Sequence, residues 1–235
     1  MNTEYPGVYC PEHIAFVVIA AVLIAVGLLS VRKRVRNEKT LELIIRTSAA
    51  MHLLWICINR TAVTMEQIAE DPQVYSWLNL IPYTFCGFSS LVLSLTVLFG
   101  RRDNDILHFI VYLGLGGGIA TLAYPDFLEY QNFWDLSSYS SLIHHGCMIW
   151  LTLLLLVTGQ FRPTIKKWYC YPIGYAFMML LGLFELDALK FPEAINIARP
   201  LLPGAPLVTS WYGIMVISTI LVWLAEWLWS RKSGN

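Results

Sequence analysis

Long apolar runs alternate with short polar segments along most of the chain. A helix needs about 20 predominantly apolar residues to cross a bilayer. Seven runs meet that requirement, at residues 12–31, 41–61, 77–99, 106–124, 138–159, 168–188 and 210–230. The pattern predicts an all-α protein, a polytopic bundle of about seven transmembrane helices. Because the loops are too short to hold a separate core, residues 1–235 are predicted to form a single integral membrane domain.

Basic residues gather in alternate connecting segments. The loops "RKRVRNEKT", "GRRDND" and "QFRPTIKK" and the tail "SRKSGN" hold most of the lysines and arginines, and seven spans place all four on one side. Arg60, Lys190 and Arg199 are the basic residues of the other side. Because cytoplasmic loops carry the excess of positive charge, the N-terminus is predicted to lie outside and the C-terminus in the cytoplasm.

Composition agrees with a membrane protein. Hydrophobic residues make up 57% of the chain and charged residues 14%, against about 25% charged in soluble domains. The formal net charge is zero, so no nucleic-acid partner is expected. The five cysteines show no C-x-x-C spacing, which argues against a disulfide scaffold or a zinc knuckle, and no cofactor is expected. The segment "MNTEYPGVYCPEH" lacks a positively charged n-region, so no cleaved signal peptide is expected.

Titratable residues of several spans fall in the half of the membrane that this orientation places outside. His52, Cys86, His144 and His145 lie about 9–14 Å below that surface, at 1.5 Å per helical residue. Ionisable residues are costly in lipid and usually face a bundle interior or a wet cavity. Their matched depth predicts one pocket that opens toward the outer leaflet. Adjacent helical residues point about 100° apart, so only one of His144 and His145 is expected to face it.

Other polar residues lie near the same depth or at the predicted mouth. The candidates for binding groups in the pocket are Asp126, Glu185, Asp187, Thr84, Tyr83, Asn59 and Arg60. The inner halves of these spans carry almost no titratable group. His108 and Glu226 stand near the cytoplasmic ends of their spans and are interpreted as solvated interface residues.

Glycine and proline predict two local features. Gly114 and Gly118 have the G-x-x-x-G spacing that lets helices approach closely, which predicts tight packing of the fourth span against the third or fifth. The run "GLGGG" is not a phosphate loop, because no strand precedes it and no Lys-Ser or Lys-Thr pair follows. Pro82 removes a backbone hydrogen bond and predicts a kink that opens the third span one turn before Cys86.

Three segments together resemble a known family. They are "LIPYTFCGFSS", "GLGGGIATLAYPDF" and "SLIHHGCMIW" with the following "QFRPT". In this order and spacing, over residues 77 to about 167, they resemble the YwaF-like integral membrane proteins of bacteria. That family is related to an animal acyltransferase, transmembrane protein 164, which remodels ether phospholipids. The resemblance implies a multi-span protein of the bacterial cytoplasmic membrane with a cysteine and a histidine at its centre.

The resemblance also implies roles for single residues. The acyl-carrying nucleophile corresponds to Cys86, and its base to His144 or His145, with the His-Gly arrangement favouring His145. Relatives carry a histidine at the position of Thr84, two residues before the cysteine. That departure makes His52 the candidate for a second base.

Two hypotheses of different classes follow. The first is a lipid acyltransferase or acyl hydrolase that acts on a membrane phospholipid, in which Asp126, Glu185 or Asp187 orients the imidazole. The second is a transporter or solute-binding protein, in which the His, Asp and Glu cluster binds a small solute or relays protons. A metal site of His52, Cys86 and His144 is a third reading, ranked below these because no ligand pair has helical i, i+3 or i, i+4 spacing. The scarcity of titratable groups in the cytoplasmic half of the spans favours the enzyme. The sequence does not indicate an oligomeric state.

Overall fold

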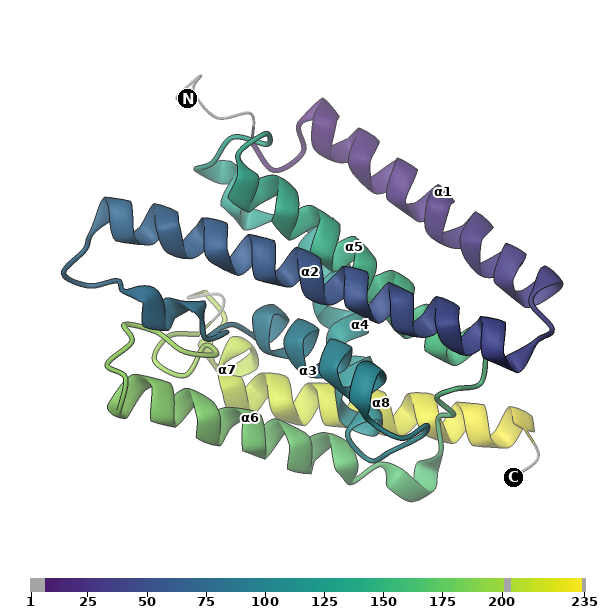
Figure 1. Ribbon diagram of the computed structural model, residues 1–235. Coiled ribbons are helices and arrows are strands. Elements are labelled where there is room, and N and C mark those ends of the chain that lie inside the picture. The colour runs from purple at the N-terminus through teal and green to yellow at the C-terminus, as the bar shows by residue number, and fades with distance from the viewer. Residues whose placement is uncertain (1–6, 201–203, 234–235) are drawn as a thin grey trace.

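The computed structural model describes residues 7–200 and 204–233, and these residues form helices and loops without a β-strand (Figure 1). The α-helices are α1 (Pro11–Arg34), α2 (Glu38–Glu70), α3 (Phe85–Phe99), α4 (Leu107–Ala123), α5 (Leu136–Val157), α6 (Cys170–Asp187), α7 (Pro206–Thr209) and α8 (Trp211–Ser233). The connecting segments contain the 3₁₀ helices η1 (Trp77–Leu80), η2 (Asp126–Glu129) and η3 (Ile165–Lys167). Six helices are long and apolar enough to cross a membrane, and α3 is a shorter apolar helix. The predicted polytopic helical bundle is confirmed.

The third predicted span, 77–99, is not one kinked helix. It divides into η1, an extended segment and α3, which has only 15 residues and a length of about 22 Å. Pro82 disfavours the helical conformation at Ile81 and offers no N–H, so the chain runs extended until Thr84. The Thr84 hydroxyl then accepts a hydrogen bond from the Gly87 N–H at 3.0 Å and starts α3 as its N-cap.

The second helix is longer than the predicted span 41–61. α2 has 33 residues and extends about 50 Å, continuing three turns past Arg60 to Glu70. The added segment "TAVTMEQIAE" contains no glycine or proline, and its charged residues are good helix formers. The apolar run in the sequence ends near Arg60, whereas the hydrogen-bonded helix continues to Glu70.

The glycines of α4 pack against α5, as their spacing predicts. A Cβ on Gly118 would lie 2.8 Å from Ile149 Cγ1, and one on Gly114 would lie 3.4 Å from Met148 Cγ. Any larger side chain at Gly118 would therefore push the two helices apart. The next glycine, Gly117, faces α3 instead, where its Cβ would lie 3.3 Å from Cys86 Sγ.

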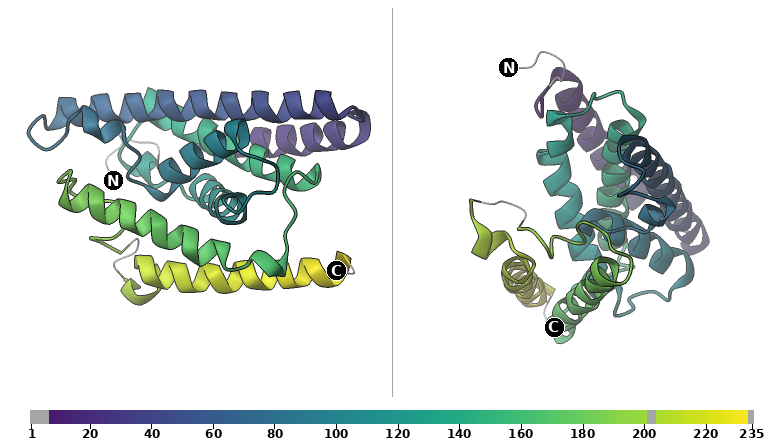
Figure 2. Two further views of the ribbon diagram at one scale, coloured as in Figure 1. Left: turned by 60° about the horizontal axis from the view of Figure 1, so that its bottom comes forward. Right: turned by 90° about the vertical axis from the view of Figure 1, so that its left-hand side faces the viewer.

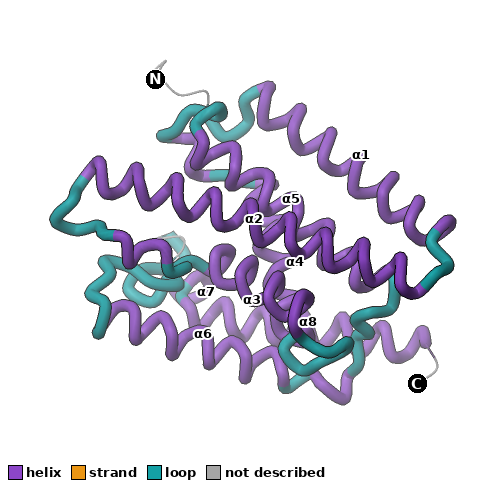
Figure 3. The backbone as a smooth tube through the Cα atoms, viewed as in Figure 1, coloured by secondary structure: helices purple, strands orange, loops and turns teal. Residues whose placement is uncertain are grey.

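Four helices form the centre of the bundle, and the other long helices lie around them. α2, α3, α4 and α5 pack on one another, α6 and α8 run side by side against α4, and α1 lies along α5 (Figure 2). α1 buries one described side chain, His13, whose Nε2 donates to the Leu122 carbonyl at 3.0 Å. The loops gather toward two ends of the bundle (Figure 3). We call the end formed by residues 35–37, 100–106 and 158–169 the basic end.

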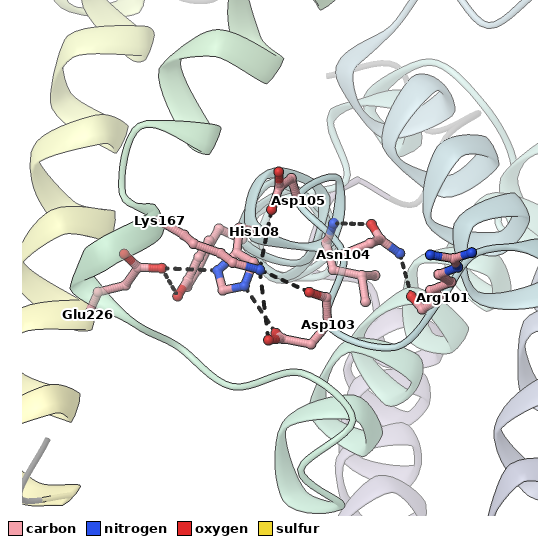
Figure 4. A network of polar contacts seen from close by, with 9 residues as sticks. Arg101, Asp103, Asn104, Asp105, His108, Lys167 and Glu226 are labelled. Carbon is pink, nitrogen blue, oxygen red and sulfur yellow. Dashed lines mark hydrogen bonds and ion pairs between the residues drawn. The ribbon is translucent and has the colours of Figure 1, made fainter.

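A buried polar network at the basic end corrects one expectation. His108 and Glu226 are 1% and 0% exposed, so neither is a solvated interface residue. His108 Nε2 lies 3.0 Å from Asp103 Oδ1, and its Nδ1 lies 3.6 Å from Glu226 Oε1 (Figure 4). Tyr112 donates to the same Glu226 oxygen at 2.9 Å, and Lys167 Nζ donates to the Asp103 carbonyl at 3.0 Å. The network joins α4, α8 and two loops, so this half of the bundle is not free of titratable groups.

Candidate functional site

A cavity of about 350 Å³ lies at the end of the bundle opposite the basic end. It is enclosed by the last turns of α2, the segment that precedes α3, the loop that follows α4, and the first half of α5. Its lining includes Asn59, Arg60, Tyr83, Thr84, Cys86, Asp126, His144 and His145. All of the residues predicted for the pocket line it except His52, Glu185 and Asp187. Both adjacent histidines face the cavity, whereas the sequence analysis expected only one.

Cys86 stands in the first turn of α3, directly beyond the Pro82 break. Its Sγ lies 3.5 Å from Thr121 Oγ1 on α4, and the residue is half-buried. The first N–H groups of a helix have no acceptor within the helix. The Thr84 cap satisfies Gly87, and the N–H groups of Phe85 and Cys86 remain in the same first turn as the thiol. These donors and the positive end of the helix dipole favour negative charge at this point.

Two imidazoles of α5 line the same cavity, and each has one ring nitrogen without a partner. His145 Nδ1 donates to the Ser141 carbonyl at 2.7 Å, and His144 Nδ1 donates to the Ser140 carbonyl at 3.2 Å. A carbonyl oxygen only accepts, so each neutral ring carries its proton on Nδ1 and has a bare lone pair on Nε2. Both Nε2 atoms are buried and have no hydrogen-bond partner. Each is therefore prepared to accept a proton from a group in the cavity.

His52 lies behind these rings rather than on the cavity wall. It is fully buried, its Nδ1 lies 2.9 Å from Ser94 Oγ, and its ring stacks on His144 at 6.5 Å between centroids. His144 in turn lies 4.0 Å from His145, centroid to centroid. The three imidazoles thus form a row that leads from the core to the cavity, with His144 and His145 at the end that lines it.

The wall formed by α2 is fixed by hydrogen bonds to its neighbours. Asn59 Nδ2 donates to the Ser137 carbonyl at 2.8 Å, which ties α2 to the first turn of α5. The next residue donates as well: an Arg60 Nη bonds to the Asn79 carbonyl, and the guanidinium lies 4.7 Å from the centroid of the Tyr83 ring. These contacts hold α2, η1 and the segment before α3 in one arrangement around the cavity.

The three predicted carboxylates have different surroundings. Asp126 lines the cavity, and its charge interacts with Cys86. Asp187 is exposed at the surface, where its Oδ1 lies 3.7 Å from Lys190 Nζ. Glu185 is fully buried behind the wall, within electrostatic range of Arg60. The imidazoles of α5 are oriented by main-chain carbonyls, and none of these carboxylates bonds to them in the described structure.

The extension of α2 adds cavity residues that the sequence analysis missed. Val63, Glu66, Gln67 and Glu70 continue the face begun by Asn59 at helical spacing. That periodicity is the signal that could have identified them. The cavity wall also includes Tyr75, and partial burial raises the pKa of its phenol, which the charges of Tyr83, Glu70 and Asp71 raise further. This part of the wall therefore carries a neutral phenol beside carboxylates.

The described residues form no group of three or more His, Cys, Asp or Glu that could hold a metal ion. His52 faces Ser94 and Cys86 faces Thr121. The arrangement thus gives no support to a metal site of His52, Cys86 and His144.

Comparison with models of protein families finds one match over nearly the whole chain. The matching model is that of the TMEM164 family, and it covers residues 8–230. The matched region runs from the segment before α1 into the last turns of α8 and includes every residue of the cavity wall. No curated protein and no solved structure matches the chain.

Proposed function

Because the chain belongs to the TMEM164 family, we propose that it is an integral membrane acyltransferase that carries an acyl chain from a membrane phospholipid on Cys86. One observation carries the proposal. Cys86 shares a cavity with two imidazoles whose Nε2 atoms are buried and without partners. A thiol, a base and free N–H donors in one place are the parts that acyl transfer through a covalent intermediate requires. We assign the activity to a bacterial cytoplasmic membrane.

In the first step an ester of the phospholipid is broken. The thiol turns from Thr121 toward the cavity and gives its proton to Nε2 of His145, while Sγ attacks the ester carbonyl. The tetrahedral intermediate then expels the glycerol oxygen, which takes the proton back from His145. The products are a thioester on Cys86 and a lysophospholipid. His145 is preferred as the base because its Nδ1 hydrogen bond is shorter than that of His144.

The N-terminus of α3 supplies the other element of this chemistry. The tetrahedral intermediate carries negative charge on the former carbonyl oxygen. The N–H groups of Phe85 and Cys86, in the first turn of α3, have no acceptor within the helix. They stabilise that charge in the way backbone donors form an oxyanion hole.

In the second step the acyl chain leaves the enzyme. The hydroxyl of an acceptor lysophospholipid gives its proton to His145 and attacks the thioester carbonyl. The C–S bond breaks, and the sulfur takes the proton to restore the thiol. Water in place of the lysophospholipid would give a fatty acid, so the same residues would act as a hydrolase.

Proton-coupled transport is a second candidate, favoured by one observation. The network of His108, Glu226 and Tyr112 provides a second buried titratable cluster, at the basic end of the bundle. A transporter needs polar groups in both halves of the membrane. None of these three residues lines the cavity, however, so two separate clusters have to be coupled for this function. The enzyme needs the cavity alone.

The test is the intact mass of the purified protein after incubation with phospholipid, before and after hydroxylamine. We expect an acyl-sized gain that hydroxylamine removes, because hydroxylamine cleaves thioesters. Cys86→Ala should abolish the gain. Cys147→Ala is the matched control, because Cys147 is a cysteine of α5 outside the cavity wall. A gain that survives Cys86→Ala, or no gain with unchanged lipids after long incubation, would refute the proposal.

A further inference from the structure

Arg60 is a buried cation with unused hydrogen-bonding capacity. It is 7% exposed, lines the cavity, donates from one Nη to the Asn79 carbonyl and stacks on Tyr83. Its Nε has no hydrogen-bond partner. A guanidinium offers five N–H donors in a fork that suits carboxylate and phosphate. The Asn79 carbonyl and the Tyr83 ring therefore hold Arg60 in position, while part of its guanidinium remains free to donate.

Glu185 is a buried carboxyl group on the far side of the cavity wall from the cavity itself, and no ion pair joins it to Arg60 in the described structure. It is 0% exposed, and neither carboxylate oxygen has a hydrogen-bond partner. It lies in the neighbourhood of Arg60: its main-chain carbonyl accepts from the Phe191 N–H at 3.1 Å, and the Phe191 ring packs on the Tyr83 ring that Arg60 covers. It stands on α6, outside the cavity wall. A buried pair is normally joined by direct hydrogen bonds, because desolvation is otherwise uncompensated.

This separation distinguishes the pair from a structural ion pair. Glu185 occupies none of the Arg60 donors, so the guanidinium can bind an anion from the cavity side. Tyr83, on which Arg60 stacks, precedes Cys86 by three residues, at most about 10 Å of main chain. One lipid molecule could therefore contact both the guanidinium and the thiol.

We propose that Arg60 binds the phosphodiester of a membrane lipid and that Glu185 is its counter-charge while the cavity is empty. The inference rests on the proposed function only in taking a lipid as the occupant. Glu66 and Glu70 line the same cavity and repel free inorganic phosphate, which carries more charge than a diester. The apolar chains of a lipid add affinity that an inorganic ion lacks.

The test measures binding without chemistry. A phospholipid with ether-linked chains has no ester to attack, so its affinity reports the site whether or not Cys86 is acylated. It is compared with a dialkylglycerol of the same chains and with inorganic phosphate, by native mass spectrometry and thermal shift on the full chain. The variants are Arg60→Gln, Glu185→Gln and the double variant. Arg46→Gln is the control, since Arg46 is an exposed arginine of α2 that pairs with Glu42.

The expected results differ for each variant. The unaltered chain should bind the phosphodiester lipid about tenfold more tightly than the dialkylglycerol, as a charge-assisted hydrogen bond provides. Arg60→Gln should abolish this preference, and Arg46→Gln should keep it. Glu185→Gln should keep or increase the preference, because it removes the competing anion. The double variant should melt at a higher temperature than Arg60→Gln, since it no longer buries an unpaired carboxylate, yet it should show no preference.

Three outcomes would overturn the proposal. They are an unchanged preference in Arg60→Gln, a loss in Glu185→Gln as large as that in Arg60→Gln, and equal stabilisation by inorganic phosphate. The last would indicate a free-anion site rather than a lipid site. Arg60-dependent binding without a thioester would refute the acyltransferase and leave this inference standing. A thioester without Arg60-dependent binding would refute this inference and leave the acyltransferase standing.

Discussion

Cys86 Sγ lies 3.5 Å from Thr121 Oγ1, across the contact between α3 and α4. In the described structure no hydrogen bond joins this thiol to an imidazole, although both line one cavity. The resting thiol is thus held against α4 rather than bonded to His145. Catalytic hydrogen bonds often form only once substrate is bound. The close packing of α4 around the sulfur therefore controls where the nucleophile rests.

Three neighbouring glycines of α4 test this dependence. A Cβ on Gly117 would lie 3.3 Å from Cys86 Sγ, whereas one on Gly116 would have no atom within 4 Å. We expect Gly117→Ala to slow thioester formation by about tenfold or more, because small displacements of a nucleophile are costly to rate. Gly116→Ala should leave the rate unchanged and can stabilise the helix by about 0.5–1 kcal/mol.

Gly118→Ala completes the series. Its Cβ would lie 2.8 Å from Ile149 Cγ1, so it should lower the free energy of unfolding by about 1–3 kcal/mol. Intact-mass time courses and melting temperatures separate the three effects. Equal rates for Gly116→Ala and Gly117→Ala would mean that packing at the sulfur does not limit the reaction.

The two cavity histidines should differ in their effect on acylation. Glutamine fills the space of a histidine but cannot accept a proton at neutral pH. We expect His145→Gln to slow thioester formation by about 10²–10⁴-fold, the range of general base catalysis. His144→Gln should cost much less, since in the proposed mechanism it packs beside the base. Rapid-quench intact-mass measurements check the order, and a larger loss in His144→Gln would assign the base to His144.

Hydropathy predicted the fold because the bilayer sets the length of each apolar run. The prediction from hydropathy was wrong where the end of a helix does not coincide with the end of an apolar run. A window of 20 residues averages over Pro82, so the break before α3 was expected only as a kink. The extension of α2 was missed for the opposite reason, because Glu66 and Glu70 lower hydropathy without breaking a helix.

The sequence predicts the depth of each site residue along its helix, and that part of the site could be predicted. Cys86, His144 and His145 share a depth, and they line one cavity. Which face of a helix a residue occupies depends on packing between distant segments. For that reason the pairing of Glu226 with His108 and the stacking of Arg60 on Tyr83 could not be predicted from the sequence.

The N-cap of α3 should matter for both stability and reaction. Thr84 Oγ1 accepts from the Gly87 N–H and fixes the first turn that carries Cys86. We expect Thr84→Ala to lower the free energy of unfolding by about 1 kcal/mol and to slow acylation, since a frayed turn misplaces both the thiol and the N–H donors. Thr84→Ser retains the hydroxyl and should restore both quantities. If Thr84→Ala and Thr84→Ser react equally fast, the cap does not position the nucleophile.

The basic-end network separates the two candidate functions. Glu226 accepts from Tyr112 at 2.9 Å and lies 3.6 Å from His108, so Glu226→Leu takes away the acceptor of the Tyr112 hydroxyl and the carboxylate beside His108. We expect a loss of about 3 kcal/mol in the free energy of unfolding, measured by detergent unfolding, and about 1 kcal/mol for Tyr112→Phe, which removes one hydrogen bond.

An acyltransferase that uses the cavity alone should keep its rate of thioester formation per folded molecule in both variants. A proton-coupled transporter should instead lose pH-driven uptake into vesicles in Glu226→Gln, which keeps the shape of the side chain and removes its charge. An unchanged acylation rate with no vesicle uptake would place Glu226 in the scaffold, where it holds α8 against α4.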